Sequence, residues 1–288
     1  MAVKKAVIPI AGLGTRFLPL TKAVPKEFLP LVDKPVLQYI IEEALASGIK
    51  EIIFVNRPEK KGILKYFKPN KNLIKTLKKR KKESILKELK RLDNISKNIS
   101  FKQVFQRKPL GDGHALLQAK SLIGKTACAV AWADDIVESK TPCFLQLIRV
   151  FQKYRRPVIA LSRIPKESFS SYGLVAGKKI GPRTYRLTKI IEKPQVKEAP
   201  SNLAIVGRYV LNPEIFDFLS KARSNKKGEI SMSDILAEKI REGKEILGYE
   251  FEGKWLECGN KLAYLKSNLY LSLKHPQFGK ELKKFLKK

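Results

Sequence analysis

The sequence has few of the residues that build disulfide frameworks and zinc sites. Its 288 residues include only three cysteines and two histidines. Cys128, Cys143 and Cys258 are odd in number and widely spaced, and they form no zinc-type pattern with the histidines. This usage fits a reducing compartment, so we expect a cytoplasmic protein.

Long apolar runs are also missing. No apolar stretch reaches the length that crosses a bilayer. The N-terminal segment 1–12 has two lysines before a short apolar stretch, but it lacks a small-residue cleavage site and continues into a glycine-rich loop. We interpret it as a first buried strand rather than a signal peptide, and we expect no membrane association.

Acidic residues are scarce relative to basic ones. Asp and Glu number 27 against 59 Lys and Arg, which gives a net charge of +32. The lysines are scattered along the chain, and the densest run, 78–91, has helical spacing with only Leu and Ile between its charges. A surface that binds single strands would carry interleaved aromatic residues. We therefore interpret the run as a solvated helix face and expect nucleic-acid binding to be at most nonspecific.

Apolar runs alternate with helical patterns, which predicts an α/β fold: a Rossmann-like mixed, mostly parallel sheet flanked by helices. Strands are expected at 5–10, 51–56, 99–104, 127–133, 157–163 and 245–256, with several more between 171 and 212. Helices are expected at 35–47, 71–92, 113–121, 142–154, 213–222 and 231–242. The tail 261–288 has an amphipathic pattern interrupted near His275-Pro276. We expect one catalytic domain over 1–260, with 261–288 as its helical arm.

The first strand is followed by a candidate phosphate-binding loop, AGLGTR at 11–16. Glycines let backbone N–H groups approach phosphate oxygens and form an anion nest. Arg16 can grip a phosphate with its planar guanidinium, and Lys26 adds a second positive charge.

Three competing interpretations, two of this loop and one of a second candidate phosphate loop at 119–126, are weaker. The dinucleotide fingerprint fails because Phe17 stands where its third glycine belongs. A Walker A loop ending at Gly124-Lys125-Thr126 fails because Ala119 replaces its first glycine. An ordinary tight turn leaves Arg16 and the Pro-Lys-Glu triplet at 25–27 unexplained.

The segment 6–35 resembles the signature of the sugar-1-phosphate nucleotidyltransferases, and within them the bacterial group that joins UTP to glucose 1-phosphate. Further segments resemble family motifs in the same order: QRKPLGDGHALLQA at 106–119, WADDIV at 132–137, SYGLV at 171–175, IEKP at 191–194, APSNLAIVGRYVL at 199–211, KGEISMSDIL at 227–236 and ECGNKLAY at 257–264. The segment 57–97 is the least similar part.

The resemblance implies a reaction and a set of site residues. The sugar phosphate attacks the α-phosphorus of UTP and expels pyrophosphate, so catalysis requires positioning and charge neutralisation. The implied catalytic residues are Arg16, Lys26, Asp134 and Lys193. The implied nucleotide-binding residues are Ala11, Gly12, Gly14, Thr15, Glu27, Gln106 and Gly111. The implied sugar-binding residues are Gly173, Glu192, Asn202, Val206 and Gly207.

The resemblance also implies a Mg²⁺ cofactor and a homo-oligomer. Asp134, placed at the end of a buried strand, is the expected magnesium ligand. Asp135 is expected on the opposite strand face and therefore away from the metal. For His114 we expect a packing or helix-start role, because an ionised phosphate needs no general base to attack.

The sequence departs from the family pattern at two positions. Glu257 precedes Cys258-Gly259 where the family usually has an aspartate that serves as a second metal carboxylate, and we expect Glu257 to take that role. Asp112 stands between two glycines where a neutral residue is common. The alternatives left open are a related enzyme that uses dTTP or another sugar phosphate, and a non-catalytic paralogue that binds nucleotide sugar or nucleic acid.

Overall fold

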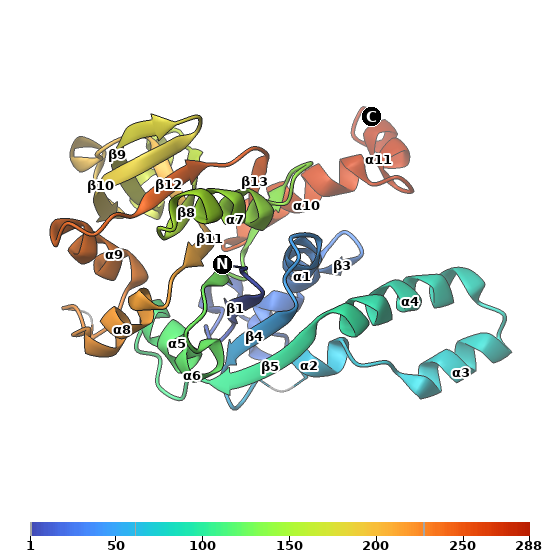
Figure 1. The fold of residues 1–288 in the computed structure, drawn as a ribbon. Helices are drawn as coiled ribbons and strands as arrows, with labels where there is room; N and C mark the ends of the chain where they lie inside the picture. Colours follow the sequence, from blue (N-terminus) through green and yellow to red (C-terminus); the bar gives the residue numbers. More distant parts are fainter. Residues whose placement is uncertain (1, 61, 227) are drawn as a thin grey trace.

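The computed structural model describes residues 2–60, 62–226 and 228–288 (Figure 1). The strands are β1 (Lys5–Pro9), β2 (Pro30–Leu31), β3 (Lys34–Pro35), β4 (Glu51–Asn56), β5 (Ser100–Phe105), β6 (Cys128–Ala131), β7 (Asp135–Glu138), β8 (Val158–Arg163), β9 (Gly173–Gly181), β10 (Thr184–Glu192), β11 (Leu203–Leu211), β12 (Leu247–Glu250) and β13 (Lys254–Glu257). The α-helices are α1 (Val36–Ala46), α2 (Ile63–Tyr66), α3 (Lys71–Lys79), α4 (Glu83–Asn98), α5 (Asp112–Gln118), α6 (Lys120–Ile123), α7 (Cys143–Tyr154), α8 (Glu214–Lys221), α9 (Met232–Arg241), α10 (Lys261–Lys274) and α11 (Gly279–Phe285).

The central sheet has nine strands in the order β5-β4-β1-β6-β11-β8-β12-β10-β9. The pairings among β5, β4, β1 and β6 are all parallel. Beyond β6 the pairings are antiparallel, except for the parallel pair β8 and β12. The α/β fold with a mixed sheet is thereby confirmed, but the sheet is not mostly parallel, because five of the nine pairings among its described strands are antiparallel. Its parallel half carries the glycine-rich loop after β1.

Alternating side chains of the strands serve two cores, one on each face of the sheet. On β4, Ile52 and Phe54 pack with α1, α4 and α7, whereas Ile53 and Val55 pack with α5, α6, α8 and α9. These residues are fully buried, as expected for parallel strands that are covered on both faces. The two helical layers leave the carboxyl ends of the strands open, and the site lies there.

Two predicted elements are each divided in the structure. The predicted helix 71–92 is the hairpin of α3 and α4, in which the chain reverses through Lys81 at a left-handed φ of 53° (Figure 1). The reversal brings apolar side chains such as Leu73 of α3 and Leu92 of α4 to a shared groove, whereas one straight helix would leave its stripe in water. The predicted strand 245–256 is β12 and β13, separated near Gly253 at a φ of 138°.

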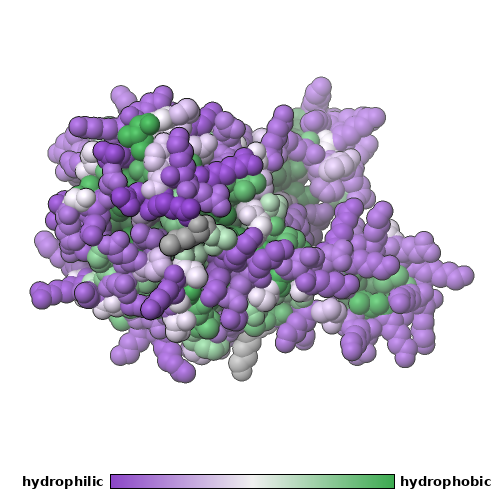
Figure 2. All heavy atoms as spheres, viewed as in Figure 1, coloured by the Kyte–Doolittle hydropathy of each residue, from purple (hydrophilic) through white to green (hydrophobic). Residues whose placement is uncertain are grey.

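The C-terminal helices α10 and α11 extend beside the body, and the chain leaves the helix at His275, as predicted (Figure 1). Hydrophilic side chains cover most of the face seen in Figure 2, in keeping with the high positive charge. No helix in the described part of the chain combines the length and apolar character needed to cross a bilayer.

Candidate active site

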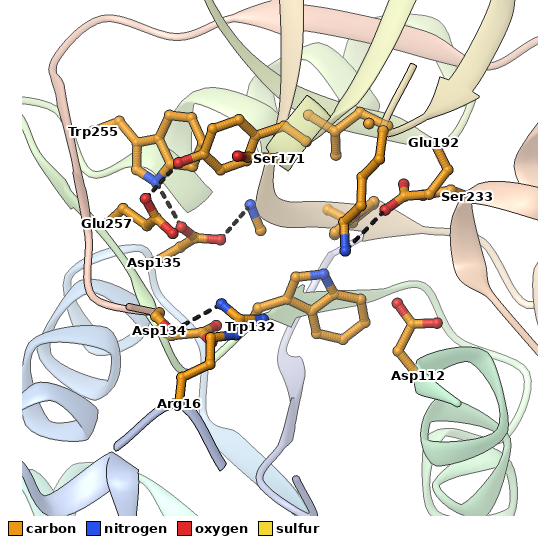
Figure 3. A pocket seen from close by; sticks show the side chains of 17 residues that line it. Arg16, Asp112, Trp132, Asp134, Asp135, Ser171, Glu192, Ser233, Trp255 and Glu257 are labelled. Atoms are coloured by element: carbon orange, nitrogen blue, oxygen red, sulfur yellow. Dashed lines mark hydrogen bonds and ion pairs between the residues drawn. The ribbon is translucent and has the colours of Figure 1, made fainter. Parts of the chain in front are cut away.

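Two adjoining cavities lie beyond the carboxyl ends of β1, β6 and β10 and against the middle of the antiparallel strand β11. The first, here called the loop cavity, has a volume of about 320 Å³ and is lined by the segments after β1 and β5. The second, called the sheet cavity, has a volume of about 270 Å³ and is lined by residues of β9 to β11 and β13 (Figure 3). Asp112, Trp132 and Asp134 line both, so they form the boundary between the two cavities.

The loop cavity collects several residues that the sequence assigns to nucleotide binding. Ala11, Gly12, Gln106 and Gly111 all line it. The Gln106 side-chain NH₂ donates to the Gly111 carbonyl over 2.9 Å and contacts Nδ1 of His114 at 3.0 Å. Its Oε1 accepts no hydrogen bond from the described residues, so this oxygen is available to an N–H donor of a ligand.

Gly111 has a steric reason to be glycine. Its φ is 97°, and a Cβ there would lie 2.5 Å from the Ile230 carbonyl oxygen. The bond from Gly113 N to the same oxygen, at 2.9 Å, holds this close approach. The PLGDGHA segment is thereby pressed against the chain that leads into α9, which fixes one wall of the loop cavity.

The remaining residues of the glycine-rich loop contribute to the site by positioning Arg16. Gly14 has a left-handed φ of 68° and precedes the 3₁₀ turn Thr15–Phe17. The turn carries Arg16 into the sheet cavity, where Nη1 donates to the Gly259 carbonyl over 2.8 Å. Gly14 and Thr15 therefore position Arg16, and neither is among the described residues that line a cavity.

Asp134 and Lys26 form an ion pair at the boundary of the cavities, with Lys26 Nζ 2.6 Å from Asp134 Oδ2. Burial raises the pKa of Asp134, but the charges of Lys26 and Arg16 outweigh that effect and lower it overall. Burial lowers the pKa of Lys26, and the carboxylates of Asp134 and Glu27 more than offset it, so this pKa is raised. Both groups are therefore charged near neutral pH.

The expectation that Asp135 faces away from Asp134 is wrong. β6 ends at Ala131 and the chain turns before β7 begins at Asp135, so the alternation of a single strand does not apply. Both carboxylates line the sheet cavity (Figure 3). Asp135 accepts hydrogen bonds from Trp255 Nε1 at 2.6 Å and Gly207 N at 3.1 Å. Burial and the neighbouring Asp134 charge raise the pKa of Asp135 to about 7.

Glu257 lies in the same cavity, paired through β13 with Asp135 of β7. Its carboxylate accepts hydrogen bonds from the Tyr172 hydroxyl and from Asn260 Nδ2, the latter at 3.1 Å. These two hydrogen bonds fix the orientation of the Glu257 carboxylate in the cavity.

Gly259 leaves a gap next to Asp134 and Glu257 in which their oxygens could act as cation ligands. A Cβ on Gly259 would lie 3.1 Å from Arg16 Nη1, 3.3 Å from Asp134 Oδ2 and 3.4 Å from Glu257 Oε1, so any side chain there would fill the gap between the two carboxylates and Arg16. Among the described residues, no group of three or more His, Cys, Asp and Glu side chains forms a metal cluster. Magnesium needs no such cluster where one or two carboxylates and substrate phosphates complete its shell.

The far wall of the sheet cavity holds the predicted sugar-side residues Gly173, Glu192 and Lys193. Lys193 follows β10 at a φ of 48°, which is rare for a residue with a side chain and turns the chain sharply out of the strand. Its Nζ lies 4.0 Å from Glu192 Oε1, and both side chains are largely exposed. A Cβ on Gly173 would come within 2.8 Å of Glu192 Oε2, so glycine makes room for the Glu192 carboxylate.

The nucleotidyl transferase family model matches residues 5–272, which include every residue that lines the two cavities. The chain belongs to the nucleotidyl transferase family. This confirms the resemblance seen in the sequence motifs.

Several known proteins align with almost the whole chain. A UTP–glucose-1-phosphate uridylyltransferase of Staphylococcus epidermidis is 41% identical over 286 residues, which are 99% of this chain and 98% of the relative. A UTP-bound UGPase of Acinetobacter baumannii has a TM-score of 0.89 at 35% identity and covers 99% of both chains. A UDP-glucose pyrophosphorylase complexed with UDP-glucose has a TM-score of 0.86 at 36% identity and covers 95% of this chain and 100% of that one.

Besides Gly14 and Thr15, three predicted site residues of this nucleotidyl transferase lie outside the linings of the two cavities. Glu27 is fully buried and both of its oxygens lie 3.1 Å from Lys60 Nζ, which also donates to the Ile10 carbonyl over 2.7 Å. Val206 is buried in the opposite core, and Asn202 accepts a hydrogen bond from Arg163 at 2.9 Å. Glu27 thus fixes the loop after β1 through Lys60.

Several residues that line the sheet cavity were not predicted from the sequence. Gly207 lines the sheet cavity as predicted, and its β11 neighbours Ile205 and Tyr209 lie on the same face as Gly207. A strict period-two pattern along β11 would have selected these positions and placed Val206 on the other face. Tyr172 and Trp255 were missed because an aromatic residue beside a strand end is usually packing, and only the fold brings them to the carboxylates.

Proposed function

We propose that this protein transfers the uridylyl group of UTP to glucose 1-phosphate, giving UDP-glucose and pyrophosphate. One observation carries the proposal: a cavity bordered by the glycine-rich loop and Lys26 shares a wall with a second cavity bordered by Glu192 and Lys193. Two anionic substrates can meet across Asp134 in that arrangement. The names and bound ligands of the similar enzymes support UTP and glucose 1-phosphate as the pair.

The chain's own residues supply positioning and charge. Lys26 neutralises the triphosphate as it lies along the loop and exchanges its bond with Asp134 for a phosphate oxygen, while Arg16 reaches the reacting phosphates beside Asp134 from the sheet cavity. Gln106 Oε1 accepts the N3–H of uracil, which cytosine lacks. Lys193 neutralises the sugar phosphate while Glu192 accepts hydrogen bonds from sugar hydroxyls, so the phosphate oxygen lies in line with the α-phosphorus.

A magnesium ion held by Asp134 and Glu257 would supply charge neutralisation at the reacting phosphate. The convergence of the two carboxylates near Gly259 supports this assignment. No general base is required, because the attacking phosphate is ionised at neutral pH. His114 is committed to Gln106 and Gln118, consistent with a packing role.

Pyrophosphate release over a panel of substrates tests the function. We expect the highest kcat/KM with UTP and glucose 1-phosphate in the presence of Mg²⁺, and much lower values with dTTP, CTP, ATP or GTP. A clear preference for dTTP or for another sugar 1-phosphate would contradict the assigned substrates. Salt-sensitive nucleic-acid binding, without turnover of any pair of nucleotide and sugar phosphate, would contradict an enzymatic function.

Lys193 and Arg16 both line the sheet cavity, but Lys193 lies on its far wall and Arg16 lies beside Asp134 at the boundary with the loop cavity, so we expect their variants to affect different substrates. Lys193→Ala is expected to raise the KM for glucose 1-phosphate by about 10- to 100-fold, because a hydrogen bond to a charged group contributes about 1.5–3 kcal/mol. Arg16→Ala is expected to raise the KM for UTP or lower kcat on the same scale. Steady-state kinetics with each substrate varied in turn measures both. Lys197→Ala, an exposed lysine on the next turn, serves as the control, and equal effects of both variants on both substrates would refute the assignment.

Glu257 is predicted to act with the metal. Glu257→Gln is expected to lower kcat at limiting Mg²⁺, with partial rescue by excess Mg²⁺, because the amide loses the charge while its oxygen can still accept from Asn260 and its NH₂ can donate to the Tyr172 hydroxyl. Glu257→Asp is expected to retain activity. A magnesium titration of kcat measures both, with the exposed Glu252→Gln as the matched control. If Glu257→Gln matches the parent at limiting magnesium, Glu257 has no metal role.

The proposal includes a catalytic domain over residues 1–260 and a helical arm over 261–288, within a cytoplasmic homo-oligomer. Leu262, Leu265 and Leu269 of α10 are 62%, 61% and 47% exposed at helical spacing, which is typical of a surface that self-associates. Light scattering gives the mass in solution. A single-chain mass at every protein concentration would contradict the homo-oligomer.

A further inference from the structure

Asp112 lies where the two cavities meet and has no part in the mechanism described so far. It begins α5 and lines both the loop cavity and the sheet cavity. Its side chain is exposed to the cleft. Figure 3 shows its carboxylate beside the Trp132 ring, on the side of the cleft away from Asp134 and Glu257.

One oxygen of this carboxylate is fixed by the fold. Oδ1 accepts hydrogen bonds from Gly113 N at 2.7 Å and from Met232 N, the first residue of α9, at 2.9 Å. The carboxylate therefore bridges the starts of two helices, where the N–H groups favour a negative charge. Oδ2 accepts no hydrogen bond from the described residues, so an oriented acceptor is left for the cleft.

The charge environment limits what this acceptor can bind. Asp134 is paired with Lys26, and Glu192 lies near Lys193, whereas no described cation forms an ion pair with Asp112. An unpaired carboxylate repels the phosphates of both substrates. Its favourable partner is a neutral donor, and a hydroxyl is the neutral donor that a nucleotide and a sugar phosphate both carry.

We infer that Asp112 is a specificity-determining residue whose Oδ2 accepts a hydrogen bond from a sugar hydroxyl of the bound substrates. The hydroxyl belongs either to the ribose of the nucleotide or to the hexose, because Asp112 borders both cavities. The inference rests on the proposed function. A deoxy substrate would leave Oδ2 unpaired inside a site filled with phosphate, and such sites reject analogues that lack the hydroxyl.

The test compares hydroxyl and deoxy substrates in the parent and in Asp112→Asn. The nucleotide arm sets UTP against 2′-deoxyUTP and 3′-deoxyUTP, and the sugar arm sets glucose 1-phosphate against its 2-deoxy and 3-deoxy analogues. For the parent we expect one analogue to lose about 10- to 100-fold in kcat/KM, the range for a hydrogen bond to a charged group. In Asp112→Asn the amide oxygen keeps the bonds to Gly113 and Met232 while an NH₂ replaces Oδ2, so that loss is expected to fall below about threefold.

Asp217→Asn, which removes an exposed carboxylate on α8, is the matched control and should keep the parent ratios. A response confined to the nucleotide arm assigns the ribose, and one confined to the sugar arm assigns the hexose. Equal use of all analogues by the parent would overturn the inference. So would an Asp112→Asn variant that weakens every substrate equally, because a purely structural cap predicts that result.

Calorimetry separates this inference from the proposed function. Binding of UDP-glucose and of its 2′-deoxyribose and 2- and 3-deoxyhexose analogues measures the same discrimination without turnover. If the parent releases no pyrophosphate yet binds the deoxy ligand about tenfold or more weakly, and Asp112→Asn removes that difference, the inference stands and the catalytic proposal fails. If binding shows no such difference, the inference fails.

Discussion

Asp134→Asn is expected to lower kcat by about a hundredfold or more while the protein stays folded. Asp134 is the carboxylate shared by the two cavities, and its oxygen lies beside the gap next to Gly259. An amide keeps the size of the side chain but removes the charge that balances Lys26 and would hold a metal. Removing one electrostatic group from such a preorganised site typically costs about 10²–10³ in kcat.

Single-turnover kinetics of pyrophosphate release measures this loss, and thermal unfolding verifies that the variant is folded. Asp217→Asn again provides a matched control with the same change of charge on the surface. Addition of excess EDTA to the parent is expected to abolish turnover. Near-normal turnover of Asp134→Asn, or full parental activity in EDTA, would refute the role of Asp134 and of Mg²⁺.

Arg208→Met is expected to lower the free energy of unfolding by about 3–5 kcal/mol, since removing one partner leaves the other charge buried and unpaired. Arg208 is fully buried, and its Nη2 lies 3.0 Å from Glu43 Oε2 of α1. The same guanidinium donates to the carbonyl oxygens of Gly207 at 3.0 Å and Asp135 at 2.7 Å. It therefore ties α1 and β11 to the turn that carries Asp134.

Urea denaturation followed by circular dichroism measures the change. Arg163→Met is the matched control, because Arg163 makes a similar ion pair with Glu250 but is about half exposed. Exposed pairs contribute about 0–1 kcal/mol, so a small shift is expected there. Equal shifts for the two variants would contradict the role of the buried network.

The fold and the family could be predicted because their signals are local in sequence. The glycine-rich loop and Arg16 follow β1, and the Glu192-Lys193 pair stands at the end of β10. Carboxyl ends of strands are where the ligands of an α/β sheet bind. Asp134 follows β6, and the same rule explains why it lines one cavity with Ala11 and Gly12.

The remaining features depend on contacts between distant segments. The turn between β6 and β7 brings Asp135 into the cavity, and no periodicity in WADDIV reports that turn. Glu27 lies outside the cavity linings because it forms a buried ion pair with Lys60, a residue of the segment in which no family motif was found. The reversal at Lys81 depends on packing of α3 against α4, which helix propensity does not report.

Transfer of label from UTP tests the central claim most directly. The protein is incubated with Mg²⁺, glucose 1-phosphate and UTP labelled either at the α-phosphate or at the γ-phosphate, and the products are separated. Attack on the α-phosphorus predicts that the α-label appears in UDP-glucose and the γ-label in pyrophosphate, with no transfer when glucose 1-phosphate is omitted. A γ-label on the sugar, or release of the α-label without glucose 1-phosphate, would contradict the account.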